Sequence, residues 1–311
     1  MGDRSKIEWT DATWNPVTGC TKVSAGCKFC YAERDFHRPY PGRAFTDVQI
    51  HPERLNQPLH WKSPRRIFVD SMSDLFHERI PQHFIDDVFQ VMENCQRHTF
   101  QILTKRVSRM SQYLYYRYRG HSAPSHLWFL TSVENQETAN AHIPELLEIR
   151  SFMGVSVLGV SYEPALGPLD FSKIITHHKP PLEDLEVNIH SLVCVVPPHL
   201  DWVIAGGESG PKARPSHPDW FRSVRDQCLA AGVPFFFKQW GEWIPECPPN
   251  FCKISKRRWS VETFAWGKNG AQYNPKNPDP DDFPKMLYRV GKKRAGRLLD
   301  GREWSEFPKK L

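Results

Sequence analysis

The chain has 311 residues, of which 40% are hydrophobic, and it carries a formal net charge of +6 with a pI near 8.8. This length suits one large α/β domain or two smaller ones. No stretch approaches the roughly eighteen apolar residues that a membrane span requires, and residues 1–6 are polar rather than signal-like. We therefore expect a cytoplasmic protein with no membrane partner, whose mild positive charge favours an anionic partner such as nucleic acid.

Short apolar runs recur along the chain, each followed by a polar cluster and a helical pattern. The run at 66–69 is followed by polar residues 70–74, and similar units cover 100–106, 127–135, 154–164, 202–210 and 233–240. Strands that alternate with helices predict a parallel sheet, and this many in series favour a complete or partial parallel β/α barrel. The active site of such barrels lies at the carboxyl ends of the strands, where these polar clusters fall. Solvated loops, helix caps and glycine turns are the alternative for any single cluster.

Two regions interrupt the alternation. Residues 171–200 contain Pro180-Pro181 and Pro197-Pro198, which predicts an insertion between the fifth and sixth strands. From about Ile244 the chain is rich in Pro, Asn, Lys and Trp without a sustained period. We expect a barrel over residues 1–243 and an irregular extension over residues 244–311 that packs on it.

Three of the eight cysteines lie close together in the sequence. Cys20, Cys27 and Cys30 form a C-x6-C-x2-C motif in a loop over residues 16–31. In a reducing compartment, clustered thiols bind metal more often than they form disulfides. Three thiolates can hold three irons of a 4Fe-4S cluster and leave the fourth iron open to a substrate or cofactor. Zinc is the alternative, with His37 as the fourth ligand.

The other cysteines give weaker signals. Cys247 and Cys252 could hold a second metal, but no companion pair accompanies them. The remaining thiols, Cys95, Cys194 and Cys228, lie in apolar surroundings and are expected to be buried.

The end of the cysteine motif, Cys27-Lys28-Phe29-Cys30, resembles the radical S-adenosylmethionine superfamily, in which a C-x-aromatic-C sequence follows the first barrel strand. The common spacing there is C-x3-C-x2-C, so this loop has three additional residues. The chain also resembles, over nearly its whole length, bacteriophage and bacterial proteins known as the phage three-Cys-motif family, whose role is largely unassigned. The segments that carry this similarity are residues 15–20, 71–76, 103–106, 132–135, 206–210, 238–241 and 295–301.

The resemblance implies a 4Fe-4S cluster on the three cysteines, S-adenosylmethionine on the open iron and an external electron donor. Reductive cleavage of S-adenosylmethionine would then give a deoxyadenosyl radical that abstracts hydrogen from a substrate inside the barrel. It does not supply the substrate, which nucleic acid could be. Two other functions remain open: a non-catalytic, metal-stabilised nucleic-acid-binding protein, and a barrel that keeps the cluster for sensing or electron transfer.

Polar residues at predicted strand ends are candidates for holding the cofactor, because acids suit an ammonium group or ribose hydroxyls and glycines allow close approach. Gly206-Gly207-Glu208 has the composition of the superfamily's glycine-glycine-glutamate motif, but it follows the sixth strand instead of the second, so its role is not carried over. The cofactor candidates are Ser71, Ser73, Asp74, Ser132, Glu134, Asn135, Glu163, Gly206, Gly207 and Glu208.

Three cations also fall at predicted strand ends, namely Lys105, Arg106 and Lys238. A charge there is costly unless it meets an anionic group, so these residues could bind a carboxylate or phosphate of the substrate. Surface salt bridges are the alternative.

The segment 106–119 interleaves tyrosines with arginines. Such a surface could hold phosphates and stack bases, and the basic groups at 256–258 and 292–294 permit the same interpretation. A helix with an aromatic core face and a charged solvent face would have a similar sequence.

Overall fold

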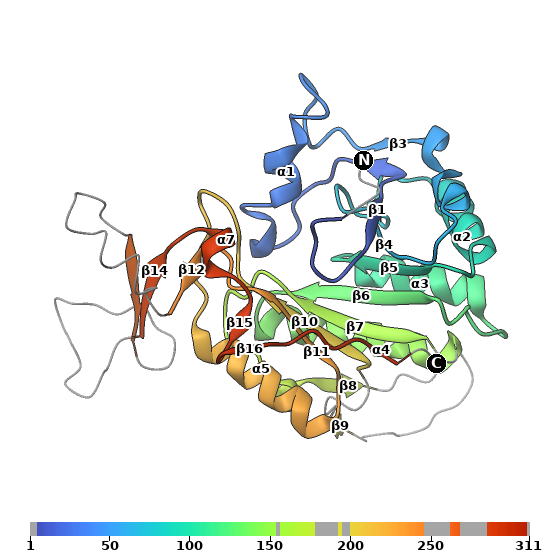
Figure 1. Ribbon diagram of the computed structural model, residues 1–311. Coiled ribbons are helices and arrows are strands. Elements are labelled where there is room, and N and C mark those ends of the chain that lie inside the picture. The colour runs from blue at the N-terminus through green and yellow to red at the C-terminus, as the bar shows by residue number, and fades with distance from the viewer. Residues whose placement is uncertain are drawn as a thin grey trace.

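A computed structural model of the chain describes residues 5–153, 156–177, 192–194, 200–245, 262–267 and 285–309. Its central sheet has seven parallel strands in the order β1-β4-β5-β6-β7-β10-β11 (Figure 1). The spatial order follows the chain order, so each of these strands lies beside the next one and β1 and β11 stay at the two edges. The sheet with its helices is a partial β/α barrel, which confirms the prediction from the sequence. The strands are β1 (Ala12–Trp14), β4 (Arg66–Val69), β5 (Thr99–Thr104), β6 (Leu127–Val133), β7 (Val157–Tyr162), β10 (Trp202–Gly206) and β11 (Phe235–Gln239).

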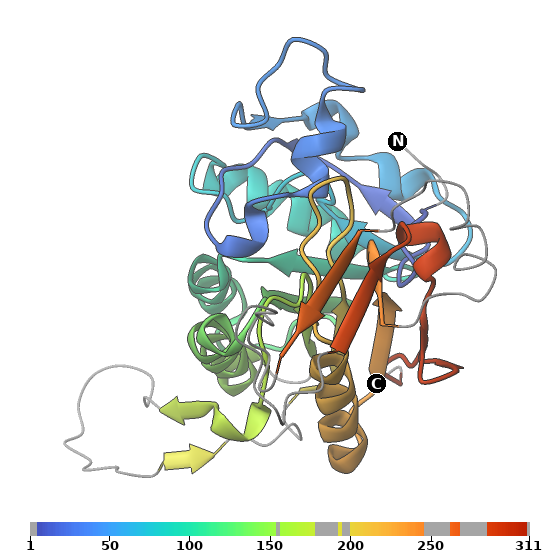
Figure 2. The same cartoon turned by 90° about the vertical axis from the view of Figure 1, so that its left-hand side faces the viewer.

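Four longer helices connect consecutive strands and lie along one side of the sheet (Figure 2). Along β5, Phe100 and Ile102 pack in the core with these helices, whereas Leu103 belongs to a second cluster on the opposite side. This alternation follows from the two-residue period of a strand. No helix in the described ranges is long and apolar enough to cross a bilayer. The helices are α2 (Gln82–Asn94), α3 (Val107–Tyr118), α4 (Gln136–Met153) and α5 (Pro218–Ala231).

The concave side of the sheet is filled near the amino ends of the strands. Trp128, Trp202 and Phe236 stand at the first or second position of their strands and pack with Trp9 and Phe68. These aromatic side chains close the bottom of the partial barrel. The cavity that remains therefore lies at the carboxyl ends.

Short elements flank the sheet. The cysteine loop lies between β2 (Val17–Thr18) and α1 (Tyr31–Phe36), and β2 pairs with β3 (Gln49–Ile50). In the predicted insertion, β8 (Ile175–His177) and β9 (Leu192–Cys194) form an antiparallel pair. Single turns of 3-10 helix occur at η1 (Ala25–Cys27), η2 (Pro52–Arg54), η3 (Gln57–His60) and η4 (Phe171–Lys173).

The described parts of the extension contain a small antiparallel sheet, ordered β12 (Trp243–Ile244), β14 (Lys285–Arg289) and β13 (Thr263–Trp266). After it come α7 (Lys292–Ala295) and a hairpin of β15 (Leu298–Leu299) and β16 (Arg302–Glu303). The possible metal ligands Cys247 and Cys252 and the basic group at 256–258 lie outside the described residues.

Candidate iron-sulfur site

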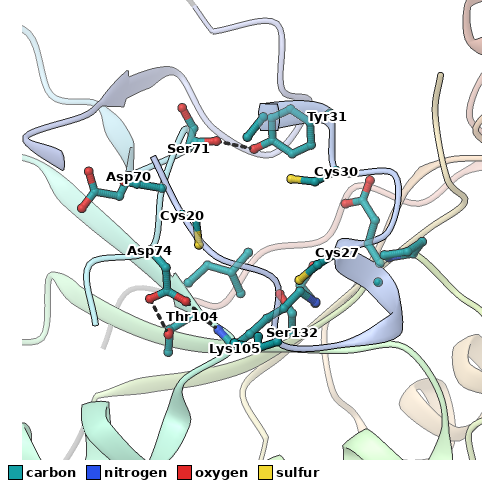
Figure 3. Close-up of a pocket in the computed structure, with 18 of the residues that line it drawn as sticks. Cys20, Cys27, Cys30, Tyr31, Asp70, Ser71, Asp74, Thr104, Lys105 and Ser132 are labelled. Carbon is teal, nitrogen blue, oxygen red and sulfur yellow. Dashed lines mark hydrogen bonds between the residues drawn. The ribbon is translucent and has the colours of Figure 1, made fainter. Parts of the chain in front are cut away.

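Cys20, Cys27 and Cys30 surround one cavity at the carboxyl ends of the strands (Figure 3). The cavity is open to solvent, and its space together with that of its open mouth amounts to about 1140 Å³. None of the three thiols is in a disulfide. The structure therefore brings the predicted metal ligands together at the mouth of the partial barrel.

A glycine sets the path of the chain into this loop. Gly19 has a φ of +88°, and a Cβ at this position would lie 2.5 Å from the Asp47 carbonyl oxygen and 2.8 Å from that of Phe45. The next amide, from Cys20, donates to the Phe45 carbonyl at 2.9 Å. Any larger residue before Cys20 would both strain the backbone and push the loop away from its support.

Two residues of the cysteine loop, Ser24 and Gly26, pack against Glu134, the residue that follows β6. Ser24 Oγ donates to Glu134 Oε1 at 2.7 Å, and Lys105 Nζ pairs with the same oxygen. A Cβ on Gly26 would lie 2.3 Å from that oxygen. The segment between Cys20 and Cys27 thus docks on a buried carboxylate.

Arg106 contacts the first cysteine directly. Its Nη1 donates to Cys20 Sγ at 3.6 Å and to Asp74 Oδ2 at 3.2 Å. Asp74 also accepts from Thr104 Oγ1 at 2.7 Å and from the Lys105 amide at 3.2 Å, which fixes its carboxylate. Burial, with a smaller contribution from the charge of Asp74, raises the pKa of Cys20 to about 12, while Arg106 acts in the opposite direction.

Two further acids of the cavity wall also have basic partners. Lys238 Nζ donates to both carboxylate oxygens of Glu163 at 2.8 Å. Arg214 Nη2 donates to Glu208 Oε1 at 2.6 Å, and its guanidinium carbon lies 5.2 Å from the centre of the Phe29 ring. Each acid thus meets the cavity as part of an ion pair.

Nine of the predicted cofactor and substrate residues line the cavity. Two of them also donate hydrogen bonds, Ser71 to Asn15 Oδ1 and Ser73 to the Val17 carbonyl. These bonds hold the ends of β1 and β2 to the end of β4. The nine residues are Ser71, Ser73, Asp74, Lys105, Arg106, Ser132, Glu163, Glu208 and Lys238.

Four predicted cofactor residues, Glu134, Asn135, Gly206 and Gly207, do not belong to the cavity wall. Glu134 lies behind the cysteine loop, and Asn135 Oδ1 accepts from the Thr138 amide at 3.0 Å at the start of α4. A Cβ on Gly207 would lie 2.0 Å from the Trp240 carbonyl oxygen, so this glycine is needed for packing between two strand ends.

Sequence reasoning missed several lining residues. Asp70 is 2% exposed with a φ of 60°, and its Oδ1 accepts from the Val17 amide at 3.0 Å. Burial raises its pKa well above the ordinary value, and its Oδ2 has no hydrogen-bond partner among the described residues. Tyr31 and Ser161 also line the cavity. The available signal for Tyr31 was its position next to Cys30, and that for Ser161 was its position near the end of a predicted strand.

The prediction that α3 presents a solvent-facing surface of arginines and tyrosines is wrong. Arg109 donates to the Ile80 carbonyl at 2.6 Å, and Arg117 pairs with Glu93 at 2.8 Å. Tyr113 and Tyr118 are buried. Among the tyrosines and arginines of 106–119, Tyr116 and Arg119 are exposed. The guanidinium carbon of Arg119 lies 5.7 Å from the centre of the Tyr116 ring. The helix has an aromatic core face and ion-paired flanks.

The zinc alternative finds no support in the positions of its ligands. His37 is exposed at the end of α1 and does not line the cavity. No three His, Cys, Asp or Glu side chains of the described ranges come together as a single metal ion would require. Thiols spread around a cavity suit a cluster, whose ligands bind different irons.

The fold and site define a partial β/α barrel with a three-cysteine loop at its carboxyl-terminal mouth. The chain belongs to the family described as "Protein of unknown function (DUF5131)", which it matches over residues 4–308. No curated protein matches it. This description does not mention phages, so the similarity to phage proteins stays a prediction.

Among solved structures, the chain has a distant likeness to spore photoproduct lyase. A cysteine-to-serine mutant matches with a TM-score of 0.43 and 11% identity, over 94% of this chain and 72% of that one. A double mutant with bound AdoMet and dinucleoside spore photoproduct matches with a TM-score of 0.41 and 10% identity, over 91% and 69% of the two chains.

Proposed function

We propose that this protein is an iron-sulfur enzyme of the radical S-adenosylmethionine type, with its cluster on Cys20, Cys27 and Cys30. One observation carries the proposal. Three thiols from one loop, none in a disulfide, line one open cavity at the carboxyl ends of a parallel β/α sheet. Thiols kept free for metal also suit the reducing cytoplasm.

The donor set fits a 4Fe-4S cluster with one open iron. Three soft thiolate ligands suit iron-sulfur chemistry, and no fourth cysteine among the described residues lines the cavity. When bound, the cluster would pass one electron from an external donor to S-adenosylmethionine, whose cleavage supplies a radical for hydrogen abstraction.

The protein's own side chains shape the rest of the cavity. Trp9, Phe68 and Leu103 contribute apolar surface that excludes water from the reacting groups. Ser132 and Ser161 are paired neighbours on β6 and β7, and both line the cavity with hydroxyls able to bond a polar ligand. These features accommodate a ligand that is part apolar and part polar, as an adenosyl group is.

Nucleic acid remains a candidate substrate on the net charge of +6 and on the exposed basic residues 292–294 of α7, because α3 does not supply the predicted phosphate-binding surface. The proposed chemistry does not depend on this choice. A peptide or a metabolite inside the cavity would meet the same cluster.

The first test is metal analysis after anaerobic purification and reconstitution with iron and sulfide. We expect about four irons per chain in the unaltered protein and loss of the cluster spectrum in Cys27→Ala. Cys95→Ala is the matched control, because Cys95 is a free, buried thiol that does not line the cavity. A full cluster signal in Cys27→Ala, or zinc in place of iron, would overturn the proposal.

Reduction of the reconstituted protein with dithionite in the presence of S-adenosylmethionine tests the second half of the proposal. Formation of 5′-deoxyadenosine is the expected outcome. A loaded cluster with no cleavage would instead favour a sensing or electron-transfer protein.

A further inference from the structure

A buried guanidinium lies against one of the three proposed cluster ligands. Arg106 is 8% exposed, and its Nη1 is 3.6 Å from Cys20 Sγ. The two residues are 86 positions apart in the chain, so the fold brings them together. A charged donor to a ligand sulfur changes how much negative charge that sulfur can carry.

The guanidinium is held from several sides. Asp74 Oδ2 accepts from Nη1 at 3.2 Å, Glu78 Oε1 accepts from Nε at 2.8 Å, and Thr21 Oγ1 accepts from Nη2 at 3.0 Å. The side chains of Arg106 and Asp74 are 6% and 8% exposed. These contacts leave Arg106 little freedom to turn toward a substrate in the cavity.

Cys20 and Cys27 differ in the charge of the side chain that contacts their sulfur. The side-chain contact of Cys27 is neutral, with Ser24 Oγ at 3.7 Å from its sulfur. Within the described residues, the hydrogen bonds to the cysteine sulfurs include one from a charged side chain, and it goes to Cys20. The asymmetry singles out Arg106 as a group directed at one ligand of the site.

We propose that Arg106 raises the reduction potential of the cluster through its hydrogen bond to Cys20, and that Asp74 is the positioning residue that aims it. This inference rests on the proposed function. It changes the role expected from the sequence, in which Arg106 was a candidate for substrate binding and Asp74 for cofactor binding.

The physical reason is the charge that reduction adds. One extra electron increases the negative charge on the cluster and its thiolates, and a nearby positive charge stabilises that state. The effect is largest where water is excluded, as it is around this buried ion pair. Removing the guanidinium should therefore make the cluster harder to reduce.

The experiment is a redox titration of the reconstituted protein, followed by the spectrum of the reduced cluster, without S-adenosylmethionine or substrate. We expect a more negative midpoint potential in Arg106→Gln than in the unaltered protein. Arg117→Gln is the matched control, because Arg117 is also ion-paired but pairs with Glu93 and Asp86 away from the cysteines. Its midpoint should stay unchanged.

Glu78→Gln should shift the midpoint potential in the opposite direction. Glu78 is an exposed partner of Arg106, so its loss should leave the fold intact and move the midpoint upward by removing a negative charge. If Arg106→Gln fails to fold, Arg106→Lys replaces it. One ammonium cannot make the same set of contacts as the guanidinium fork, so a lower midpoint than that of the unaltered protein is again expected.

The outcomes separate the two proposals. A protein that takes up no cluster would contradict the proposed function. A protein that takes up the cluster, but keeps its midpoint in whichever Arg106 variant folds, would contradict the inference about Arg106 alone.

Discussion

The side chain of residue 26 can be no larger than a hydrogen atom unless its surroundings move. A Cβ there would lie within 2.3 to 2.8 Å of three side-chain atoms of Glu134. Glu134 is 1% exposed and also pairs with Lys105 and Ser24, so its carboxylate cannot easily shift. Gly26 therefore sets the depth at which the cysteine loop docks, one residue before Cys27.

We predict that Gly26→Ala lowers cluster loading and destabilises the protein by about 1–3 kcal/mol, because the added methyl group overpacks this contact. Iron content and a urea unfolding curve measure the two effects. In the double variant Gly26→Ala/Glu134→Ala the clash is removed, so the two substitutions should be coupled in a double-mutant cycle. Simple additivity of their effects would show that the contact does not limit the loop.

At this scale the sequence supports some predictions and not others. The grouping of Cys20, Cys27 and Cys30 follows from spacing along a single loop, so it could be predicted. The contact of Arg106 with Cys20 could not, since it depends on the register of β5 against a loop 86 residues away. Asp70 was missed because its burial depends on β2 covering it, which no local pattern indicates.

Among the elements, α3 shows why interleaved arginines and tyrosines are ambiguous. Arg117 and Tyr118 both bond Glu93, and Tyr113 bonds Asp86. Both acids come from the preceding helix, α2, and the sequence of α3 alone does not contain them. The structure bears out the alternative of an aromatic core face, since Tyr113 and Tyr118 are buried, but the use of the charges required the neighbouring element.

The start of α5 depends on a histidine in place of a usual capping residue. His217 is the N-cap, and its Nδ1 accepts from the Asp219 amide at 3.1 Å. Accepting this bond requires an unprotonated Nδ1. Burial lowers the pKa of His217, although the nearby Asp219 carboxylate acts in the opposite direction.

We predict that this cap weakens as the pH falls below about 6.5, the ordinary pKa of an unfolded histidine. Between that pH and the lowered folded pKa, the unfolded chain binds more protons, so the free energy of unfolding decreases as the pH drops. His217→Asn keeps an acceptor that does not titrate. The urea midpoint should decrease less between pH 7.5 and pH 5.5 in this variant than in the unaltered protein. An equal decrease in both proteins would refute the role of His217.

Across the whole molecule, the order of β/α units could be predicted because each unit has its own apolar run and polar cluster. The short strands of the extension could not, since two to five residues are too few to establish a period. The sequence also left open whether the barrel is complete or partial, and the structure leaves β1 and β11 as two edges. The last described residues of the chain contact β10 and β11 on this open side.

These last residues stabilise the open side of the partial barrel. The Phe237 amide donates to the Trp304 carbonyl, and the Glu306 carbonyl accepts from Trp202 Nε1 at 2.9 Å. The Phe307 ring lies 5.2 Å from that of Trp202, with the Arg66 guanidinium 4.0 Å from its centre. The segment thus joins the β10 and β11 edge to β4 beneath the cavity.

We predict that Phe307→Ala destabilises the protein by about 2 kcal/mol, less than a fully buried phenylalanine would because the ring is half-buried. Tyr116→Ala is the control, since that aromatic ring is 60% exposed and its loss should be nearly neutral. Urea unfolding of both variants provides the comparison. Because Phe307 packs on Trp202 and Phe236 at the bottom of the barrel, away from the cysteine loop, iron loading of the folded variant should equal that of the unaltered protein. Equal stability of the two variants would show that Phe307 does not brace the barrel, whose bottom would then be held by the buried cluster around Trp9, Trp128 and Trp202.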